Sequence, residues 1–414
     1  MPTHDPTSGQ SQSRFLFYSH DGLGLGHTRR NLAIAAALVE LCPDASVLLA
    51  CGTDEAHRLG LPAHVDVLKL PGLRKTKNDE YAARRLPVPK NDIRYLRSCL
   101  LEAAIRAFRP AVVLIEKHPF GARGEFRAGL QTLKEYGGRS VLGLRDILDD
   151  PAVVRREWAQ HRLQERIAMF HDRVFVYGEP AVFDPVVEYR LPEPVARRTC
   201  FCGYVVNQDD DAPSDPRPPE FSRAGRARPV VLATAGGGED GFALLEHFIS
   251  AADGAPWQGI VVAGPMIPEP ELGLLREKAA RATVQLHSFI PKLPALFGFI
   301  DALVCMGGYN TLTEAAAQSI PTVCVPRIVP RFEQLIRARA FERLGLLRMV
   351  HPKELGAAAL RDAVSAALLT HREGLRDRVR ARLNFDGARC AAHELLALAA
   401  SEEVLPDSLT VAAP

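Results

Sequence analysis

The segment Cys305-Met306-Gly307-Gly308-Tyr309-Asn310-Thr311-Leu312-Thr313-Glu314-Ala315 is the clearest indication of the fold. It follows an apolar run at 302–305, typical of a strand, and leads into helical spacing at 311–319. A strand, a glycine turn and a helix in this order form the repeating unit of a parallel α/β sheet. Because ligands of such sheets bind beyond the carboxyl ends of the strands, the segment also indicates where a site would lie.

The same alternation of apolar runs and amphipathic stretches extends through the chain. In the first half we predict strands at 15–19, 46–51, 65–70, 111–116, 141–144 and 174–177, with helices at 28–41, 93–108, 124–136 and 152–170. In the second half we predict strands at 229–234, 259–263, 283–286, 302–305 and 322–325, with helices at 241–252, 271–281, 311–319 and 331–344 and a largely helical tail at 353–399. This pattern predicts parallel sheets covered by helices on both faces.

A change of composition marks a domain boundary. Between residues 207 and 228, Asp, Pro, Arg and Ser predominate and aliphatic residues are few, which is typical of a solvated connector. We therefore predict an N-terminal domain at 1–206, a linker at 207–228 and a C-terminal domain at 229–414 that ends in the helical tail. The predicted fold class is α/β, with two Rossmann-like, doubly wound domains facing a cleft.

Length, composition and charge exclude several classes of protein. The chain has 414 residues, of which 47% are hydrophobic and 24% charged, so it is neither disordered nor fibrous. It is long enough for two or three domains with apolar cores. Its 51 Lys and Arg residues against 49 Asp and Glu residues give a net charge of +2, without a long block of one sign. This balance argues against nucleic acid as a partner.

The cysteines and the apolar segments indicate the compartment. The 8 cysteines are scattered, as in a protein of a reducing compartment. Cys200 and Cys202 are one residue apart, too close for a zinc knuckle, and no other paired Cys or His cluster completes a site. We therefore predict no metal site and no cofactor. Because no secretory signal and no run of about 18 uncharged apolar residues is found, we expect a cytoplasmic protein with at most peripheral membrane association.

A first glycine turn lies between the first predicted strand and the first predicted helix. Gly24 and Gly26 allow the backbone to approach a polar ligand closely, and the following helix N-terminus favours anionic groups. A dinucleotide fingerprint needs a third glycine where His27 stands, so NAD binding is disfavoured. His27 could act as a general base near neutral pH, or it could be a capping or exposed histidine.

Two further turns could bind phosphate in the second half. Gly236, Gly237 and Gly238 follow the strand predicted at 229–234 and form a cradle of backbone amides suited to a diphosphate. They could also serve the turn alone. Gly308 precedes a predicted helix whose N-terminus could likewise meet a phosphate.

Four polar residues near these turns have two explanations each. Glu314 could accept hydrogen bonds from two hydroxyls of a ribose. Alternatively, Asn310 caps the helix and Glu314 lies in its first turn, where the helix dipole favours a carboxylate. Glu333 and Gln334 open the helix predicted at 331–344 and could bind sugar hydroxyls, with Arg327 adding positive charge, or they could be a solvated helix start.

These segments, in this order, resemble the nucleotide-sugar signature of the GT-B fold glycosyltransferases. The resemblance is to the MurG-like family 28 group, which includes the bacterial lipid-linked N-acetylglucosaminyltransferase. It implies that the N-terminal domain binds an acceptor and the C-terminal domain a nucleotide-sugar. The carrying residues are Gly307 to Ala315, Ile320-Pro321, Val325-Pro326, Glu333-Gln334 and Arg337-Ala338, together with 24–27 and 202–207, and the resemblance is thin between 52 and 200.

The resemblance implies roles for individual residues. Glu314 would bind the ribose, the main chain of Ile290 would read the uracil edge, and His27 would be the base for the acceptor hydroxyl. The diphosphate would meet Gly236, Gly237, Gly238, Gly307, Gly308, Asn310 and Thr311, and the donor sugar would meet Glu333 and Gln334. The implied reaction is an inverting, metal-independent transfer from a UDP-sugar, with amide dipoles stabilising the leaving diphosphate.

The acceptor side departs from the pattern of the MurG group. Residues 115–125 are charged where the lipid-acceptor enzymes are rich in glycine, which argues against a lipid-linked peptidoglycan acceptor. We expect a small-molecule or cell-envelope acceptor. Glu116 or His118 could share the role of base with His27, although ordinary loop polarity would explain both. The candidate acceptor-side residues are Gly24, Gly26, Glu116 and His118.

Two other functions are compatible with the same architecture. A nonhydrolysing UDP-sugar 2-epimerase would be expected to place additional catalytic carboxylates and histidines in the cleft. A noncatalytic nucleotide-sugar-binding protein would keep Glu314 and lack the chemistry.

Overall fold

A computed structural model describes residues 13–20, 26–54, 56, 60–75, 81–206, 221 and 227–401. The chain divides into two compact units. The first unit comprises Met1–Gly143, Glu165–Phe175 and Ala388–Pro414, and the second comprises Leu144–Gln164 and Val176–Gly387. Because nearly all of the linker predicted at 207–228 lies outside the described residues, the predicted domain boundaries stay a prediction, as does the cleft.

The first sheet has seven strands in the order β3-β2-β1-β6-β7-β8-β9. β1 pairs in parallel with both β2 and β6, so the strands after β1 are added on one side of it up to β3 and on its other side from β6 on. This is the topological switch point at which α/β sheets bind ligands. The strands are β1 (Arg14–Ser19), β2 (Ser46–Cys51), β3 (Val65–Lys69), β6 (Val112–Glu116), β7 (Arg139–Arg145), β8 (Arg173–Tyr177) and β9 (Thr199–Phe201).

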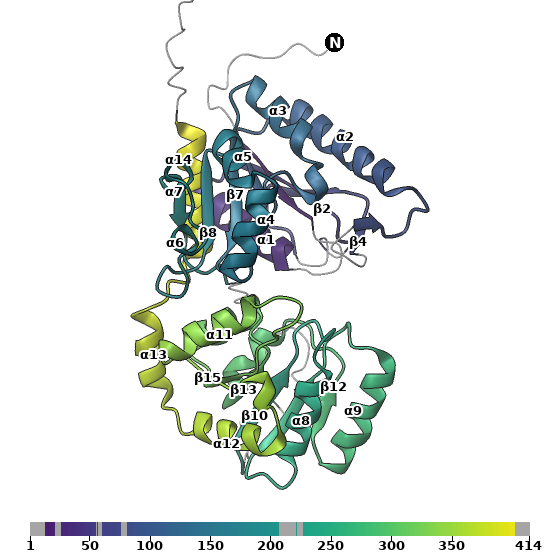
Figure 1. The fold of residues 1–414 in the computed structure, drawn as a ribbon, viewed down its shortest axis with the longest axis vertical. Coiled ribbons are helices and arrows are strands. Elements are labelled where there is room, and N and C mark those ends of the chain that lie inside the picture. Colours follow the sequence, from purple (N-terminus) through teal and green to yellow (C-terminus); the bar gives the residue numbers. More distant parts are fainter. Residues whose placement is uncertain are drawn as a thin grey trace, which may run out of the picture. The chain divides into compact units, whose positions relative to one another are not determined.

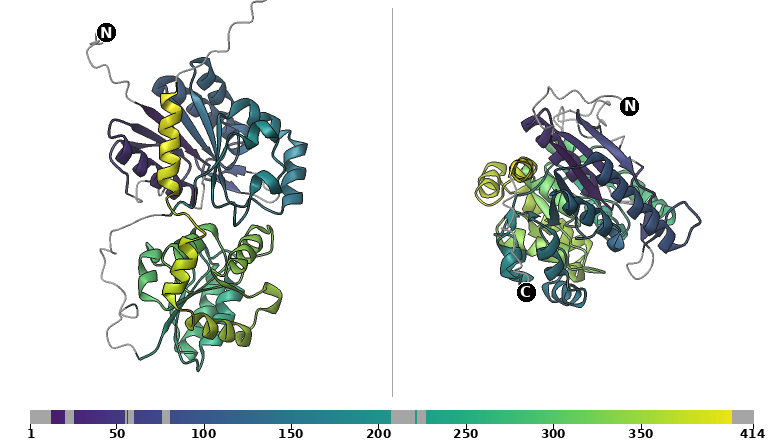
Figure 2. Two further views of the ribbon diagram at one scale, coloured as in Figure 1. Left: turned by 90° about the vertical axis from the view of Figure 1, so that its left-hand side faces the viewer. Right: turned by 90° about the horizontal axis from the view of Figure 1, so that it is seen from above.

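Helices cover this sheet, and a short hairpin adjoins it (Figure 1). The hairpin, which the sequence analysis did not predict, pairs β4 (Leu73–Lys75) with β5 (Tyr81–Ala83) in antiparallel fashion. Figure 2 shows α14 beside the sheet, and Arg389 of α14 lies 3.5 Å from Glu40 of α1. The helices are α1 (Gly26–Leu41), α2 (Lys90–Phe108), the 3₁₀ turn η3 (Ala122–Gly124), α3 (Arg127–Glu135), α4 (Pro151–Gln160), α5 (Leu163–Phe170), α6 (Pro185–Glu188), α7 (Glu193–Ala196) and α14 (Gly387–Ala400).

The prediction of one helix at 152–170 was wrong. The structure has α4 and α5 instead, and Arg162 between them has a φ of 49°. A left-handed residue cannot continue a right-handed helix, so the chain turns there although the apolar spacing continues.

The second sheet has six strands in the order β12-β11-β10-β13-β14-β15. The described strands of this sheet pair in parallel, and β10 pairs with both β11 and β13. The strands are β10 (Val230–Thr234), β11 (Gln258–Val262), β12 (Gln285–His287), β13 (Ala302–Cys305), β14 (Thr322–Cys324) and β15 (Arg348–Met349). The helices are α8 (Phe242–Ala252), α9 (Glu269–Arg281), η5 (Leu293–Phe299), α10 (Tyr309–Ala317), α11 (Glu333–Arg343), η6 (Pro352–Glu354), α12 (Ala357–Leu368) and α13 (Arg372–Arg380).

Both sheets are buried on both faces, which explains their continuous apolar runs. Every residue of β6 and of β10 is buried. The six-stranded sheet and the helices packed on it enclose a core that includes Phe248, Trp257 and Leu360. The predicted parallel α/β fold is confirmed for both sheets. Among the described helices, none combines the length and the apolar content that crossing a membrane requires.

Candidate functional site

In the first unit, three charged or titratable side chains meet at the carboxyl ends of β1 and β6. Because these strands pair in parallel, Glu116 at the end of β6 lies beside the start of α1. Oε2 of Glu116 is 3.0 Å from Nδ1 of His27 and accepts a hydrogen bond from NH1 of Arg30 at 2.7 Å. Glu116 is fully buried. NH1 of Arg30 also lies 3.3 Å from Nδ1. Because a carboxylate can only accept, the closer contact with Glu116 assigns the proton of the neutral imidazole to Nδ1 and makes Nε2 the basic nitrogen.

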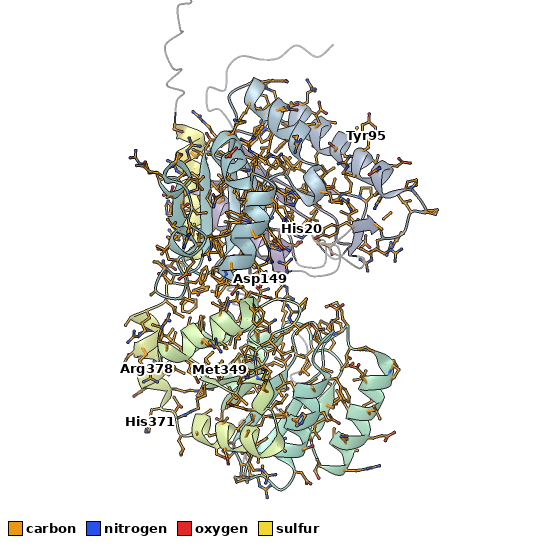
Figure 3. All side chains as sticks on the ribbon, in the orientation of Figure 1. His20, Tyr95, Asp149, Met349, His371 and Arg378 are labelled. Carbon is orange, nitrogen blue, oxygen red and sulfur yellow. The ribbon has the colours of Figure 1, made fainter. Side chains whose placement is uncertain are left out.

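The ring of His20 packs against that of His27. His20, which follows β1 and is labelled in Figure 3, has its ring centroid 5.2 Å from that of His27 and 5.1 Å from that of His118. Burial, and then the neighbouring His27 and His118, hold the pKa of His20 well below its usual range. A neutral His20 limits the positive charge that gathers here. The structure thus brings together the predicted residues His27, Glu116 and His118, with His20 between the histidines.

A buried network fixes the loop that follows Glu116. Arg97 donates to both carboxylate oxygens of Glu125, at 2.7 and 2.6 Å, and Tyr18 donates to Glu125 at 2.5 Å. The backbone N–H of Ala122 donates to the hydroxyl of Tyr18 at 2.9 Å. Since all these groups are buried, each bond is stronger than it would be in water. The sequence analysis missed this network because its members are up to 107 positions apart.

In the second unit, the glycine turn after β10 has a backbone that requires glycine. Gly236 and Gly238 have φ values of 66° and 94°. A Cβ on Gly238 would lie 2.7 Å from the carbonyl oxygen of Ala263, whereas a Cβ on Gly236 would have nothing within 4 Å. Gly237 is exposed. The turn is therefore fixed on one side and open on the other, as a backbone cradle for a ligand needs.

The turn before α10 corrects one sequence prediction. Asn310 is not the N-cap: α10 begins at Tyr309, and Gly308 is the N-cap, without a side-chain cap bond. The earlier start follows from Tyr309, whose buried hydroxyl donates to Tyr177 O at 3.0 Å. Glu314 consequently lies in the second turn, not the first. The structural explanations proposed for Asn310 and Glu314 are therefore wrong.

A salt-bridge cluster joins the two turns of this edge. Arg327, which follows β14, donates to Asp240 at 2.8 Å and to Oε1 of Glu333 at 2.9 Å. Its backbone N–H donates to Oε1 of Gln334 at 3.0 Å. Because Asp240 belongs to the loop after β10, Arg327 connects that loop to the first residues of α11.

Glu333 retains an unused acceptor. It is 4% exposed, and its Oε2 has no hydrogen-bond partner among the described residues. A buried carboxylate oxygen without a partner costs free energy, so such an atom is a candidate for contact with a ligand. Glu333 and Gln334 do open α11, as predicted.

For the remaining predicted site residues that the structure describes, it gives the position and the burial, which do not by themselves indicate a role. Ile290 is half-buried in the loop after β12, and Thr311 and Glu314 are half-buried on α10. Gly26 is the first residue of α1, and Gly307 precedes α10 with a φ of 83°. Gly24 lies outside the described residues. The roles that the resemblance implies for these residues stay predictions.

Two carboxylates of this unit were missed by the sequence analysis. Asp146, which follows β7, binds Arg337 through two hydrogen bonds of 2.7 Å. Asp149, labelled in Figure 3, accepts a hydrogen bond from the backbone N–H of Phe332 at 2.8 Å. Their place in the sequence could have indicated both residues, since acidic residues shortly after a buried strand lie at the ligand-binding edge of the sheet.

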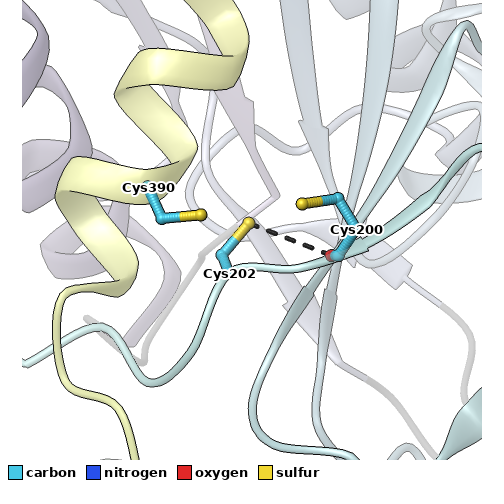
Figure 4. A group of neighbouring side chains, drawn as sticks. All are labelled: Cys200, Cys202 and Cys390. Atoms are coloured by element: carbon cyan, nitrogen blue, oxygen red, sulfur yellow. Dashed lines mark hydrogen bonds between the residues drawn. The ribbon is translucent and has the colours of Figure 1, made fainter.

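Among the described residues, three cysteines lie close enough together to be considered as ligands of a metal ion (Figure 4). The group consists of Cys200, Cys202 and Cys390, none of which forms a disulfide, and Sγ of Cys202 lies 3.9 Å from the carbonyl oxygen of Cys200. Structural zinc sites take four protein ligands, one more than this group offers. The prediction of no metal site stays a prediction.

Comparisons with known proteins give partial sequence matches and a full-length structural match. No family model matches the chain. A segment of 139 residues is 31% identical to the NDP-glycosyltransferase YjiC of Bacillus licheniformis and covers 33% of each chain. Another comparison aligns 169 residues, at 28% identity, with the UDP-N-acetylglucosamine--N-acetylmuramyl-(pentapeptide) pyrophosphoryl-undecaprenol N-acetylglucosamine transferase of Mannheimia succiniciproducens, covering 39% of this chain and 46% of that protein. These alignments span between a third and a half of the relatives.

The structural match extends over nearly the whole chain. The crystal structure of Acinetobacter baumannii MurG superposes with a TM-score of 0.58 at 13% identity, covering 93% of this chain and 99% of that one. At such low identity the likeness establishes the fold alone.

Proposed function

We propose that this chain, which has the GT-B fold and is related in sequence to MurG and the NDP-glycosyltransferases, transfers a sugar from a UDP-sugar to an acceptor hydroxyl. The observation that carries the proposal is the free Oε2 of Glu333. It is a buried, unpartnered carboxylate oxygen, held by Arg327 beside a glycine turn with open space. Such a group is suited to accept hydrogen bonds from sugar hydroxyls.

The donor contacts follow from the same edge of the six-stranded sheet. Gly236 and Gly308 have open space where a side chain would begin, so an anionic diphosphate could approach the backbone there. Gly308 is also the N-cap of α10, where backbone N–H groups point outward and the helix dipole favours negative charge. In this proposal Glu314 binds the ribose, and Gln334 assists Glu333 with the donor sugar.

The acceptor is activated by His27. Glu116 accepts a hydrogen bond from Nδ1–H of His27 and orients the ring, while Arg30 keeps the carboxylate in place. The proton of the acceptor hydroxyl moves to Nε2 of His27. The acceptor oxygen forms a bond to the anomeric carbon, and the bond from that carbon to the diphosphate breaks with its electron pair leaving on UDP. Attack opposite to the leaving group inverts the configuration.

Calorimetry with UDP tests the donor half of the proposal. We expect heat of binding, and replacing Glu314 by Ala should weaken binding by about 1–3 kcal/mol, the range for hydrogen bonds to a charged group. Glu277→Ala on the exposed face of α9 is the matched control and should leave the affinity unchanged. Absence of any binding at millimolar UDP would remove the proposal.

A panel of nucleotide-sugars tests the chemistry without knowledge of the acceptor. A transferase should release UDP slowly from its own donor by transfer to water. Formation of an epimer without UDP release would identify an epimerase instead. UDP affinity without either product, over the whole panel, would identify a noncatalytic binding protein.

A further inference from the structure

A pocket of about 390 Å³ lies within the first unit, at the same edge of the sheet as His27. It lies beyond the carboxyl ends of β2 and β3 and against the segment that follows β5. Its volume falls in the range of about 300–1,000 Å³ that is usual for small-molecule sites. The lining residues are Asp54, Lys69, Leu70, Pro71, Gly72, Arg84, Arg85, Leu86 and Leu100.

The inner wall of the pocket is apolar and held in place by hydrogen bonds. Leu70 is fully buried, and its backbone N–H donates to Cys51 O at 2.8 Å. The carbonyl oxygen of Pro71 accepts from Arg97 at 2.6 Å, so the wall is tied to the network that fixes the loop after Glu116. The backbone of Arg84 bonds to Gly72 O at 2.9 Å. The wall is thus preformed, which lowers the entropic cost of binding.

The mouth of the pocket is cationic. Among the lining residues that the structure describes, Lys69, Arg84 and Arg85 carry three positive charges and Asp54 carries one negative charge. Asp54 lies 3.2 Å from Nζ of Lys69 and 3.1 Å from NH2 of Arg85. It holds both side chains at the mouth. An apolar wall under a mouth with excess positive charge is complementary to an apolar body that carries an anionic group.

The pocket is connected to the proposed base through aromatic contacts. Tyr81 of β5 is three residues from Arg84, and its ring lies edge-on to His20 with centroids 6.1 Å apart. The ring of His20 is in turn 5.2 Å from that of His27. A series of ring contacts thus runs from the strand that precedes Arg84 to His27.

We propose that this pocket is the acceptor subsite and that it selects an acceptor with an apolar body and a phosphate or carboxylate group. The anionic group binds Arg84 and Arg85, the apolar body lies on Leu86 and Leu100, which keep exposed surface, and the reacting hydroxyl extends towards His27. The inference rests on the proposed function for the role of the pocket, whereas the binding preference can be measured independently.

Titration of the full chain with four probes tests the preference. Phenyl phosphate and benzoate carry a ring and an anionic group, phenol lacks the anion, and inorganic phosphate lacks the ring. We expect the two ring anions to bind at least about tenfold more tightly than phenol or phosphate, since a charge-assisted hydrogen bond contributes a factor of this order. The comparison of phenyl phosphate with benzoate distinguishes a phosphate acceptor from a carboxylate acceptor.

Variants assign the binding to this pocket. The double variant Arg84→Gln, Arg85→Gln should lose about tenfold or more in affinity for the ring anions. Arg94→Gln, an exposed change on α2 outside the lining, should lose none. Unchanged affinity in the double variant, or equal affinity for inorganic phosphate and the ring anions, overturns the proposal, as does a lack of binding by wild type at millimolar ring anion.

UDP binding by the same proteins separates the two proposals. The double variant should bind UDP as wild type does, which also establishes that it is folded. If wild type binds the ring anions but not UDP, the proposed function fails while the anion preference of the pocket stands. If it binds UDP but not the ring anions, the acceptor inference alone fails.

Discussion

Arg337 and Asp146 form a buried ion pair in which Nε and NH2 of the guanidinium donate to the two carboxylate oxygens, each at 2.7 Å. Both side chains are fully closed to solvent. NH1 of Arg337 also donates to the carbonyl oxygen of Gly307 at 3.0 Å. The pair therefore supports the turn that precedes α10.

Replacing Asp146 by Asn should strongly destabilise the protein. The change removes one charge and leaves the buried guanidinium uncompensated, which costs about 3–5 kcal/mol in the free energy of unfolding. Urea denaturation of the two proteins measures the difference. Glu269→Gln is the matched control, because Glu269 pairs with Arg276 on the surface and its loss should cost under about 1 kcal/mol. Equal effects of the two changes would contradict the prediction.

The sheets were predictable from the sequence because their strands are buried on both faces. A run such as 302–305 remains apolar throughout, and that pattern does not depend on distant residues. β9 and β15 have 3 and 2 residues, too few for a periodic signal, and were missed. The break at Arg162 was missed because one left-handed residue leaves the apolar spacing unchanged.

The candidate site was predictable only where its residues are neighbours in sequence. The glycine turns directly follow strands, and Glu333 and Gln334 open a helix, so position alone indicated them. By contrast, the partners of Arg337 and Arg97 lie 191 and 28 positions away, and only the folded chain identifies them. The N-cap at Asn310 was wrong because the buried hydroxyl of Tyr309, a tertiary contact, moves the helix start.

Replacing His27 by Ala should abolish most transfer but leave UDP binding intact. Removal of a general base lowers the rate by about two to four orders of magnitude. His27 belongs to the first unit, whereas the proposed donor residues belong to the second. Turnover and calorimetry with UDP measure the two effects separately. His393→Ala on the exposed face of α14 should change neither. Normal turnover of the His27 variant would assign the base to another residue, with Glu116 and His118 as the next candidates.

Replacing Arg327 by Gln should weaken the donor sugar contact more than the nucleotide contact. Without the guanidinium, Oε1 of Glu333 loses its 2.9 Å partner and the carboxylate is no longer oriented. We expect the KM for the nucleotide-sugar to rise about tenfold or more, while the affinity for UDP alone stays within about threefold. Arg339→Gln, on the exposed side of α11, is the control. A parallel loss of UDP affinity would mean that Arg327 binds the nucleotide itself.

Lowering the pH should destabilise the protein because His171 is buried in its neutral form. Burial lowers the pKa of His171 from 6.5 to about 4. Between these values the unfolded chain binds a proton that the native protein does not, so lowering the pH favours unfolding. The contribution of His171 to the free energy of unfolding is fully present above pH 6.5. It decreases by about 1.4 kcal/mol per pH unit down to about pH 4, roughly 3 kcal/mol in all.

Urea denaturation between pH 7 and pH 4 checks this prediction. His171→Gln can keep the hydrogen bond to Pro119 O, now 2.9 Å long, and does not titrate. The pH dependence of the variant should be flatter than that of wild type by the amount given above. Curves of equal slope would show that His171 takes up its proton in the native state.

Two glycine substitutions should separate strain from ligand contact. Gly238→Ala places a methyl group 2.7 Å from Ala263 O at a φ of 94°, so it should destabilise the protein by at least about 1–2 kcal/mol. Gly308→Ala meets nothing within 4 Å and changes an ordinary φ of −59°, so its effect on stability should stay below about 1 kcal/mol. If the open space at Gly308 receives the diphosphate, the added methyl group should nevertheless weaken UDP binding by about 1–3 kcal/mol, because it overfills a close contact. Thermal melting and calorimetry measure the two quantities, and undiminished UDP affinity in Gly308→Ala would place the diphosphate elsewhere.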